Sequence, residues 1–322
     1  MYKVIMAPTE GTASEKGSLS VAVKLAQRFG ADLHLVRVES CPLTIDPVSD
    51  RRMLMVTEQA FEEERLTRVR KLEALGAECC PLSEANVVTA LKDGPVGSTL
   101  RDYAKELNVD LIVMSSHSRG GLKRVTLGSA TDYLIRHTNV PVLVVKQAAA
   151  FIGAVTGDVV SRIVVPLDGS SLAGQILQLV ADLALSLNAR VSLLQVVTPQ
   201  TYSQNQIMQP GLPWWDADIA RADAYITGAA EYLVKEGLSV STDVVVSDDV
   251  AAAILDYSDR AEADLIALAT SGTGGISRLI FGRVADELTR VSRCSVLVFH
   301  PRPIPVTDTT NGRADCQVLE NA

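Results

Sequence analysis

The residues best placed to bind a ligand form two loops rich in Gly, Ser and Thr, one in each half of the chain. The first spans residues 115–129 and ends in Gly128-Ser129, and the second spans residues 269–283 and ends in Gly282-Arg283. Each loop follows an apolar strand-like run and leads into a helical pattern. Such a loop presents backbone N–H groups and the positive end of a helix dipole to an anion, most often a phosphate. Both loops are therefore candidate phosphate-binding sites.

The two loops belong to an internal repeat. Residues 109–146 align without a gap on residues 263–300, which lie 154 positions later, so that Asp110 falls on Asp264 and Gly128 on Gly282. Self-similarity at a fixed spacing indicates duplication of a structural unit. We therefore expect one domain over residues 1–146, a linker, a second domain over 161–300 and a tail. The linker is residues 147–160, and the tail, residues 301–322, has the polar composition of a disordered segment.

Strand-like and helix-like patterns alternate through both halves. Expected strands are residues 3–7, 31–38, 86–91, 111–114 and 141–145, then 162–166, 190–197, 239–246, 265–269 and 295–299. Expected helices include residues 19–29, 51–75 (ended by Gly76), 95–107, 172–187, one ending near Lys235, and 250–262. This alternation predicts an α/β protein in which each domain is an open five-stranded parallel sheet with helices on both faces.

Open sheets of this kind bind ligands beyond the carboxyl ends of their strands, where the strand order reverses. This rule places the loops after the first and fourth strands side by side. In the first half these are Pro8–Thr12 and Ser115–Ser129, and in the second they are Pro166–Ser170 and Ala269–Arg283. The ligand is expected to lie across each pair.

The composition of the chain excludes several classes of protein. Hydrophobic content of 47% with 21% charged residues is typical of a globular protein, and no apolar run approaches the ~20 residues that span a bilayer. The first residues lack the pattern of a signal peptide, so a cytoplasmic location is expected. Five irregularly placed cysteines argue against a disulfide framework, and four scattered histidines form no metal signature.

The charge distribution and the missing catalytic motifs argue against nucleic-acid-binding proteins and several classes of enzyme. Residues 1–150 hold 19 Lys and Arg against 18 Asp and Glu, whereas the remainder holds 11 against 20, which argues against a nucleic-acid surface there. No Gly-x4-Gly-Lys-Ser/Thr or Gly-x-Ser-x-Gly motif occurs. Neither a P-loop lysine nor a carboxylate pair placed for magnesium is visible. We therefore expect a protein that is not an enzyme, with slow ATP hydrolysis left open.

The chain resembles the universal stress protein family in its tandem two-domain form. The resemblance rests on a proline followed by an acidic residue after the opening strand, the Asp-Leu-Ile strand, the glycine loop and the closing apolar strand. It implies two domains with the adenine-nucleotide-hydrolase-like fold. Members that bind ATP carry a loop of the form Gly-x2-Gly-x9-Gly-Ser/Thr and an Asp after the first strand that contacts the nucleoside.

The first half matches this pattern in part. Gly128-Ser129 is intact, but Ser115 and Ser118 replace the two earlier glycines. Glu10 stands where the family has Asp, and its extra methylene would push a ribose outward. Serine adds a Cβ where a positive φ is needed, a modest penalty that a hydroxyl contact can offset.

The second half departs at other positions. Asp168, Gly272 and Gly282 are retained, whereas Ala269 replaces the first glycine and Arg283 replaces the Ser/Thr. An arginine here has two interpretations, since it can clamp a phosphate or swing into the pocket and fill it.

The resemblance implies a stress-response regulatory protein that binds ATP or AMP, with or without Mg²⁺, in at least one domain. Nucleotide occupancy would alter the surface shown to a protein partner. The alternative is an interaction scaffold whose pockets have lost nucleotide binding. In the family the closing edge strands pair between domains, so a tandem chain is expected to form an internal pseudo-dimer, and a homodimer is also open. Neither nucleic acid nor a membrane is an expected partner.

Overall fold

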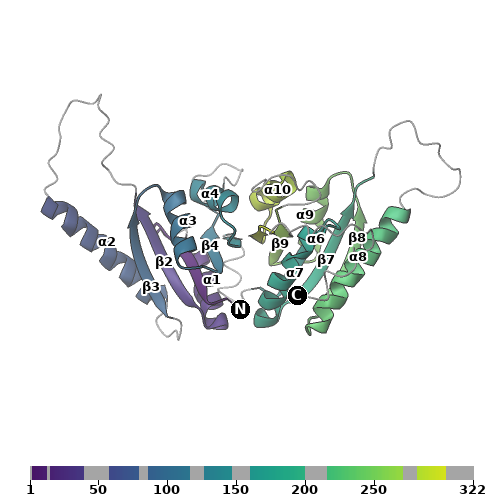
Figure 1. The fold of residues 1–322 in the computed structure, drawn as a ribbon, viewed down its shortest axis with the longest axis horizontal. Helices are drawn as coiled ribbons and strands as arrows, with labels where there is room; N and C mark the ends of the chain where they lie inside the picture. The colour runs from purple at the N-terminus through teal and green to yellow at the C-terminus, as the bar shows by residue number, and fades with distance from the viewer. Residues whose placement is uncertain are drawn as a thin grey trace, which may run out of the picture. The chain divides into compact units, whose positions relative to one another are not determined.

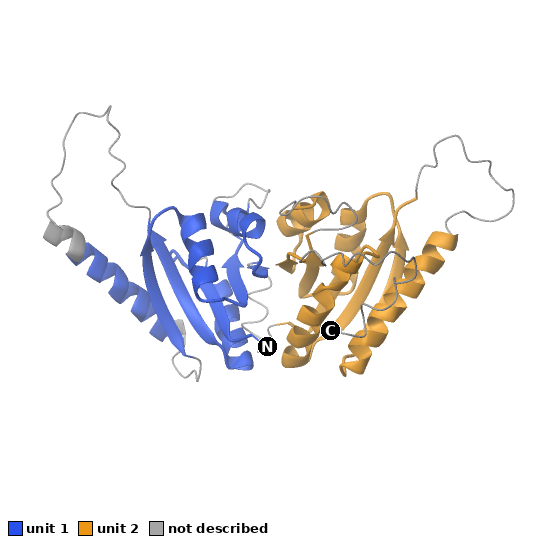
Figure 2. Ribbon diagram, in the orientation of Figure 1, with its two compact units in different colours: residues 1–159 blue, residues 160–322 orange. Residues whose placement is uncertain are grey.

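The computed structural model describes residues 2–12, 15–39, 58–79, 86–116, 127–146, 160–199, 216–270 and 281–301. The chain divides into two compact units, residues 1–159 (unit 1) and residues 160–322 (unit 2), which Figure 2 colours blue and orange. The predicted site residues Ser118 and Gly272 lie outside the described residues, as do most of the predicted linker and tail.

Unit 1 contains a parallel sheet whose described strands have the order β3-β2-β1-β4-β5 (Figure 1). Its strands are β1 (Val4–Pro8), β2 (Asp32–Glu39), β3 (Val87–Asp93), β4 (Leu111–Ser115) and β5 (Val142–Val145). Its helices are α1 (Lys16–Phe29), α2 (Glu58–Cys79), α3 (Val96–Glu106) and α4 (Ser129–His137). Helix α1 packs with α2, and α3 packs with α4. The connections through α1 and α2 run from β1 toward β3, whereas those through α3 and α4 run from β3 back toward β5. Because right-handed crossovers in opposite directions lie on opposite faces, the two helix pairs cover opposite faces of the sheet.

Unit 2 repeats this arrangement with the strand order β8-β7-β6-β9-β10, and its described pairs are also parallel. Its strands are β6 (Arg162–Leu167), β7 (Arg190–Val197), β8 (Val240–Val246), β9 (Leu265–Ala269) and β10 (Ser295–Phe299). Its helices are α6 (Ser171–Gly174), α7 (Ile176–Leu187), α8 (Asp216–Lys235), α9 (Val250–Arg260) and α10 (Arg283–Val291). The predicted α/β class, parallel sheets and tandem duplication are confirmed. The predicted pairing of the closing edge strands between domains stays a prediction.

The repeated aspartate has a structural role in both units. Asp110 Oδ2 accepts hydrogen bonds from the N–H groups of Lys3 (2.6 Å) and Val4 (3.0 Å). Asp264 Oδ2 likewise accepts from Arg162 N at 3.0 Å. Each aspartate precedes the fourth strand of its sheet, so it ties that strand to the start of the first. The repeat therefore preserves a contact that joins the two strands on which the candidate site depends.

Two predicted helix boundaries are wrong. Gly76 was expected to end its helix, but α2 continues to Cys79. A Cβ at Gly76 would lie at contact distance from β3, 3.4 Å from Thr89 Cγ2 and 3.5 Å from Val87 Cγ1, so α2 packs directly on β3 at this position. The predicted helix 172–187 is two helices, because a tight turn in which Gln175 N–H bonds the Leu172 carbonyl separates α6 from α7.

The cores of both units are built from the sheet strands and the helix faces against them. Ile5, Ile112, Ile163 and Ile266 are fully buried in their central strands.

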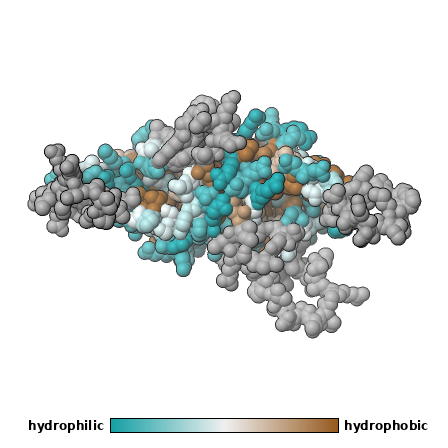
Figure 3. Space-filling view, turned by 90° about the horizontal axis from the view of Figure 1, so that it is seen from above, coloured by the Kyte–Doolittle hydropathy of each residue, from teal (hydrophilic) through white to brown (hydrophobic). Residues whose placement is uncertain are grey.

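The face seen in Figure 3 mixes hydrophilic and apolar residues, with hydrophilic ones prevailing. Exposed large apolar side chains of the described residues lie on separate elements: Leu66, Val96, Leu185, Val234, Val246 and Val291. Among the described helices, none combines the length and apolar character needed to cross a membrane.

Candidate functional site

The candidate site of each unit lies where the strand order reverses. In unit 1, β1 and β4 are parallel neighbours, with Ile5 opposite Leu111, so their carboxyl ends meet at one edge of the sheet. In unit 2, β6 and β9 are related in the same way, with Ile163 opposite Leu265. The described residues that follow these strands therefore leave from the same edge of each sheet, as the strand-order rule requires.

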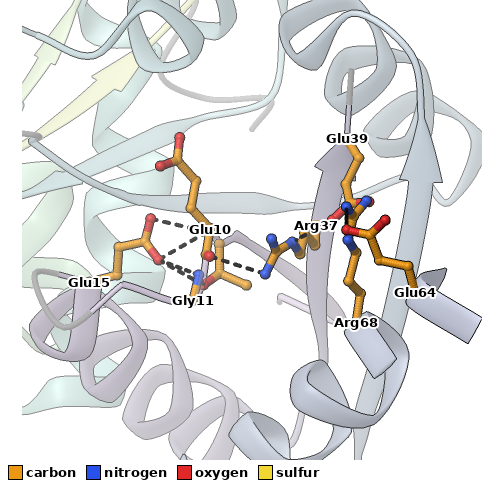
Figure 4. A network of polar contacts seen from close by, with 8 residues as sticks. Glu10, Gly11, Glu15, Arg37, Glu39, Glu64 and Arg68 are labelled. Carbon is orange, nitrogen blue, oxygen red and sulfur yellow. Dashed lines mark hydrogen bonds and ion pairs between the residues drawn. The ribbon is translucent and has the colours of Figure 1, made fainter. Parts of the chain in front are cut away.

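In unit 1, a buried carboxylate holds the loop after β1. Glu15 is only 2% exposed, and its Oε2 accepts hydrogen bonds from Thr9 Oγ1 (2.8 Å) and from the backbone N–H groups of Glu10 (3.0 Å), Gly11 (3.1 Å) and Thr12 (3.3 Å). Figure 4 shows the Glu10 side chain projecting from the loop whose backbone Glu15 holds. The predicted nucleoside-facing residue is therefore exposed, while Glu15 holds its backbone.

A row of oppositely charged side chains runs from α2 to the same loop. Arg37 Nη1 donates to the Glu10 carbonyl at 3.2 Å, and Arg37 Nε donates to Glu39 Oε1 at 3.0 Å. Glu39 also pairs with Arg68, which pairs in turn with Glu64 (Figure 4). The hydrogen bond to Glu39 is the largest cause of the raised pKa of the Arg68 guanidinium. Through this row of side chains, helix α2 and strand β2 hold the backbone carbonyl of Glu10.

The second segment of the unit 1 site runs from the end of β4 to the start of α4. Ser115 is the last residue of β4, and the N–H of the next residue, Ser116, bonds the Val145 carbonyl at 3.1 Å. Helix α4 begins at Ser129, which is exposed, and Gly128 is its N-cap. Because glycine supplies no capping side chain, the first-turn N–H groups of α4 can face an anion.

In unit 2, the loop after β6 is held by its own aspartate. Asp168 Oδ1 accepts hydrogen bonds from Ser170 N (3.0 Å) and Ser170 Oγ (2.6 Å), and Ser170 Oγ accepts from Ala173 N at the start of α6. Tyr225 OH, on α8, donates to the Ser170 carbonyl at 3.1 Å. Burial, followed by the charge of Asp168, raises the pKa of Tyr225 to about 12. Tyr225 therefore stays neutral and acts as a donor at neutral pH.

The second segment of the unit 2 site is closely packed. Gly282 is the N-cap of α10, and a Cβ on it would lie 3.2 Å from the Thr270 carbonyl just after β9. The Thr270 hydroxyl lies 2.7 Å from His300 Nδ1, and both side chains are buried. Arg283, the first residue of α10, is exposed, and Ala269 ends β9. The start of α10 therefore lies close against the end of β9, with little room for a side chain at position 282.

Sequence reasoning missed Glu15, Arg37 and Tyr225, which hold these loops through hydrogen bonds. Only Glu15 had a local signal, because Thr12-x-x-Glu15 has the spacing of a capping box, in which the glutamate reaches back to the N–H of the first residue. Arg37 and Tyr225 reach their loops from β2 and α8, across strand and helix packing that no local pattern reveals.

Comparison with known proteins agrees with this architecture. The model of the universal stress protein family matches residues 1–146 and again residues 160–300. A universal stress protein of Methanocaldococcus jannaschii is 27% identical over 46% of this chain and 84% of its own length. One of Mycobacterium tuberculosis is 25% identical over 63% of this chain and 68% of its own.

Solved structures extend the similarity of fold over nearly the whole chain. The crystal structure of a universal stress protein from Archaeoglobus fulgidus covers 92% of this chain and 98% of its own, with a TM-score of 0.64 and 17% identity. Since the family model alone accounts for both halves, the chain belongs to the universal stress protein family and carries two of its domains in tandem.

Proposed function

We propose that this protein binds an adenine nucleotide, ATP or AMP, in at least one unit and acts as a regulatory protein in a stress response. One observation carries the proposal. In each unit, an acidic residue after the first strand and a glycine-led helix N-terminus after the fourth lie beyond neighbouring strands, at the point of strand-order reversal. Glu10 and Asp168 would face the nucleoside, and the helix starts would face the phosphates.

The helix starts suit phosphate for physical reasons. The first-turn N–H groups of α4 and α10 and their helix dipoles favour negative charge, and an N-cap glycine lets a phosphate oxygen approach the backbone. In unit 1, Ser129 adds a hydroxyl, with Ser115 and Ser118 as further hydroxyl donors from the preceding loop. In unit 2, the exposed side chain of Arg283 favours the phosphate-clamp interpretation over the pocket-filling one.

The alternative is a protein-interaction scaffold without nucleotide binding. The observation that favours it is substitution of the family's loop glycines by Ser115 and Ser118 in unit 1 and by Ala269 in unit 2, together with Arg283 where the family has Ser or Thr. In either case the proposed role is regulatory rather than enzymatic, and measuring ATP turnover with Mg²⁺ tests for the slow hydrolysis left open.

Calorimetric titration of nucleotide-stripped protein with ATP, with and without Mg²⁺, tests the proposal. Gly128→Glu and Gly282→Glu place a carboxylate at the helix start of unit 1 and unit 2, respectively. Gly228→Glu is a matched control, because a Cβ at Gly228 meets nothing within 4 Å. Binding that one or both site variants abolish, and the control retains, supports nucleotide recognition at the helix starts. Absence of heat and of a thermal shift at millimolar ATP would overturn the proposal and leave the scaffold.

A further inference from the structure

The loops after the first strands of the two units correspond residue by residue. Glu10 and Asp168 lie 158 positions apart, as do Pro8 and Pro166, and Gly11 and Gly169. The same offset relates β1 and β2 to β6 and β7, since Val4 pairs with Asp32 and Arg162 with Arg190. It therefore matches Glu15 with Ala173 and Arg37 with Gln195. The two residues that hold the unit 1 loop are both replaced in unit 2.

In unit 1 the Glu10 backbone is held from both sides. Its N–H donates to Glu15, at 3.0 Å from Oε2 and 3.2 Å from Oε1, and its carbonyl accepts from Arg37 Nη1 at 3.2 Å (Figure 4). Arg37 is itself held by Glu39. Hydrogen bonds to a charged group are stronger than neutral ones, and a buried carboxylate with several donors has little freedom to move. The position of the Glu10 backbone is thus set by groups other than its own side chain.

Unit 2 lacks both of these supports. Ala173 has no side chain that could accept a hydrogen bond, and Gln195 Oε1 is buried without a hydrogen-bond partner among the described residues. A Cβ on Gly169 would lie 3.2 Å from Gln195 Nε2, so this amide lies directly against the loop, where Arg37 lies in unit 1. The loop is held instead by Asp168 Oδ1 through Ser170. In unit 2 the ligand-facing carboxylate therefore also holds its own loop.

We propose that Glu15 and Arg37 are positioning residues of unit 1, which fix the Glu10 backbone so that the longer glutamate can face the nucleoside as Asp168 does in unit 2. The inference rests on the proposed function, since it assigns how one of the proposed sites is built. It explains why the replacement of Asp by Glu at position 10 coincides with a glutamate at 15 and an arginine at 37. Each unit has one loop-holding carboxylate, but only in unit 2 is it also the ligand-facing one.

The physical gain is preorganisation. A glutamate side chain has one more rotatable bond than aspartate, and more of its freedom is lost when a ligand fixes the carboxylate. Because the Glu10 peptide is anchored on both sides, the Glu10 carboxylate can occupy fewer positions before the ligand binds. A site whose supporting contacts hold its binding group in place loses less entropy on binding. Removing either support is therefore expected to weaken ligand binding even though neither residue touches the ligand.

The test uses the full chain with Gly282→Glu as parent, so that ATP binding reports unit 1 alone. Glu15→Gln keeps the size of the side chain and removes its charge, and Arg37→Gln installs the residue of unit 2. Glu73→Gln, on the exposed side of α2, is the control for loss of one carboxylate. We expect Glu15→Gln and Arg37→Gln each to raise the ATP Kd by about three- to tenfold, with no change for Glu73→Gln.

A double-mutant cycle separates positioning from general damage. If Glu15 and Arg37 act through Glu10, their substitution in a Glu10→Ala background leaves the Kd within about twofold of Glu10→Ala alone. Should Glu15→Gln fail to fold, Arg37→Gln carries the same cycle, because its side chain is partly exposed. Unchanged affinity in both variants, or losses that add to that of Glu10→Ala, would overturn the inference. A parent that does not bind ATP also overturns it, and the Gly128→Glu chain then shows whether the proposed function survives in unit 2.

Discussion

Gly97 controls how closely α4 packs on α3, and Gly97→Ala gives a sharp prediction. A Cβ at Gly97 would lie 2.6 Å from both Cγ and Cδ1 of Tyr133 and 3.0 Å from its Cβ, whereas ordinary contacts begin near 3.4 Å. The clash involves the near part of the ring, which no rotation of a side-chain end relieves. Tyr133 is also held by Arg101, at 3.1 Å from its hydroxyl, and stacks on His137 at 4.2 Å between ring centroids.

Two opposing effects determine how much Gly97→Ala changes the free energy of unfolding. Overpacking of this kind destabilises by about 1–3 kcal/mol. Replacing a helical glycine by alanine stabilises by about 0.5–1 kcal/mol, with the lower value suited to the first turn of α3. We therefore expect Gly97→Ala to lower the free energy of unfolding by about 1–2 kcal/mol. In a Tyr133→Ala background the clash disappears, and the same substitution is expected to stabilise by about 0.5 kcal/mol.

Urea unfolding followed by far-ultraviolet circular dichroism measures the four variants of this cycle, with changes in midpoint interpreted only where the m-value is constant. Unit 2 provides a natural comparison, because Ala251 and Glu287 stand at the positions of Gly97 and Tyr133. Since α4 begins at Ser129, Gly97→Ala is also expected to weaken ATP binding in unit 1. If Gly97→Ala changes stability equally in both backgrounds, the close approach of the ring is not what requires glycine, and the reasoning fails.

Three further predictions follow from single contacts. Tyr225→Phe removes the donor to the Ser170 carbonyl. Because the pKa of Tyr225 in the folded state is raised to about 12, its stabilising effect is complete below pH ~10 and is lost as pH rises toward 12. The pKa of Tyr257 is raised to about 12 as well, so the loss of stability with pH is expected to be smaller in the variant than in the wild type, and equal slopes in pH-dependent unfolding would contradict the prediction. Gly76→Leu is expected to destabilise unit 1 by about 1–3 kcal/mol in urea unfolding, since α2 touches β3 there, and an unchanged midpoint would contradict that packing. Asp110→Ala and Asp264→Ala each leave two backbone N–H groups at the start of the first strand without their acceptor. Each variant is expected to lower the free energy of unfolding by about 1–2 kcal/mol, and a wild-type melting temperature in both would refute the strand-tying role.

Much of the fold could be predicted from local patterns. Apolar runs of strand length alternate with helical periodicity, and the repeat requires that whatever one half forms, the other forms again. The reversal of strand order then locates the site, because the carboxyl ends of neighbouring parallel strands share one edge. Glu10, Ser115, Gly128 and their counterparts were placed at that edge by this rule alone, without knowledge of any side-chain contact.

Local rules failed where packing between elements competes with them. Glycine after a helical run commonly ends the helix, yet Gly76 lies inside α2, where the helix packs on β3 despite a helix-propensity penalty of about 1 kcal/mol. The predicted single helix 172–187 is also wrong, since Ser170 caps the start of α6 and the tight turn at Gln175 ends it before α7 begins at Ile176.

By itself, the sequence determined the class, the duplication and the edge of the sheet that carries the candidate site, because periodicity and strand topology are properties of the chain order. Only the tertiary structure decided how each site loop is held. Arg37 reaches the Glu10 carbonyl because β2 lies beside β1, and Tyr225 reaches Ser170 because α8 packs against the same unit. Such contacts depend on the direction of side chains across paired elements, which residue spacing does not specify. Two loops that look equivalent in the sequence are therefore held by different residues in space.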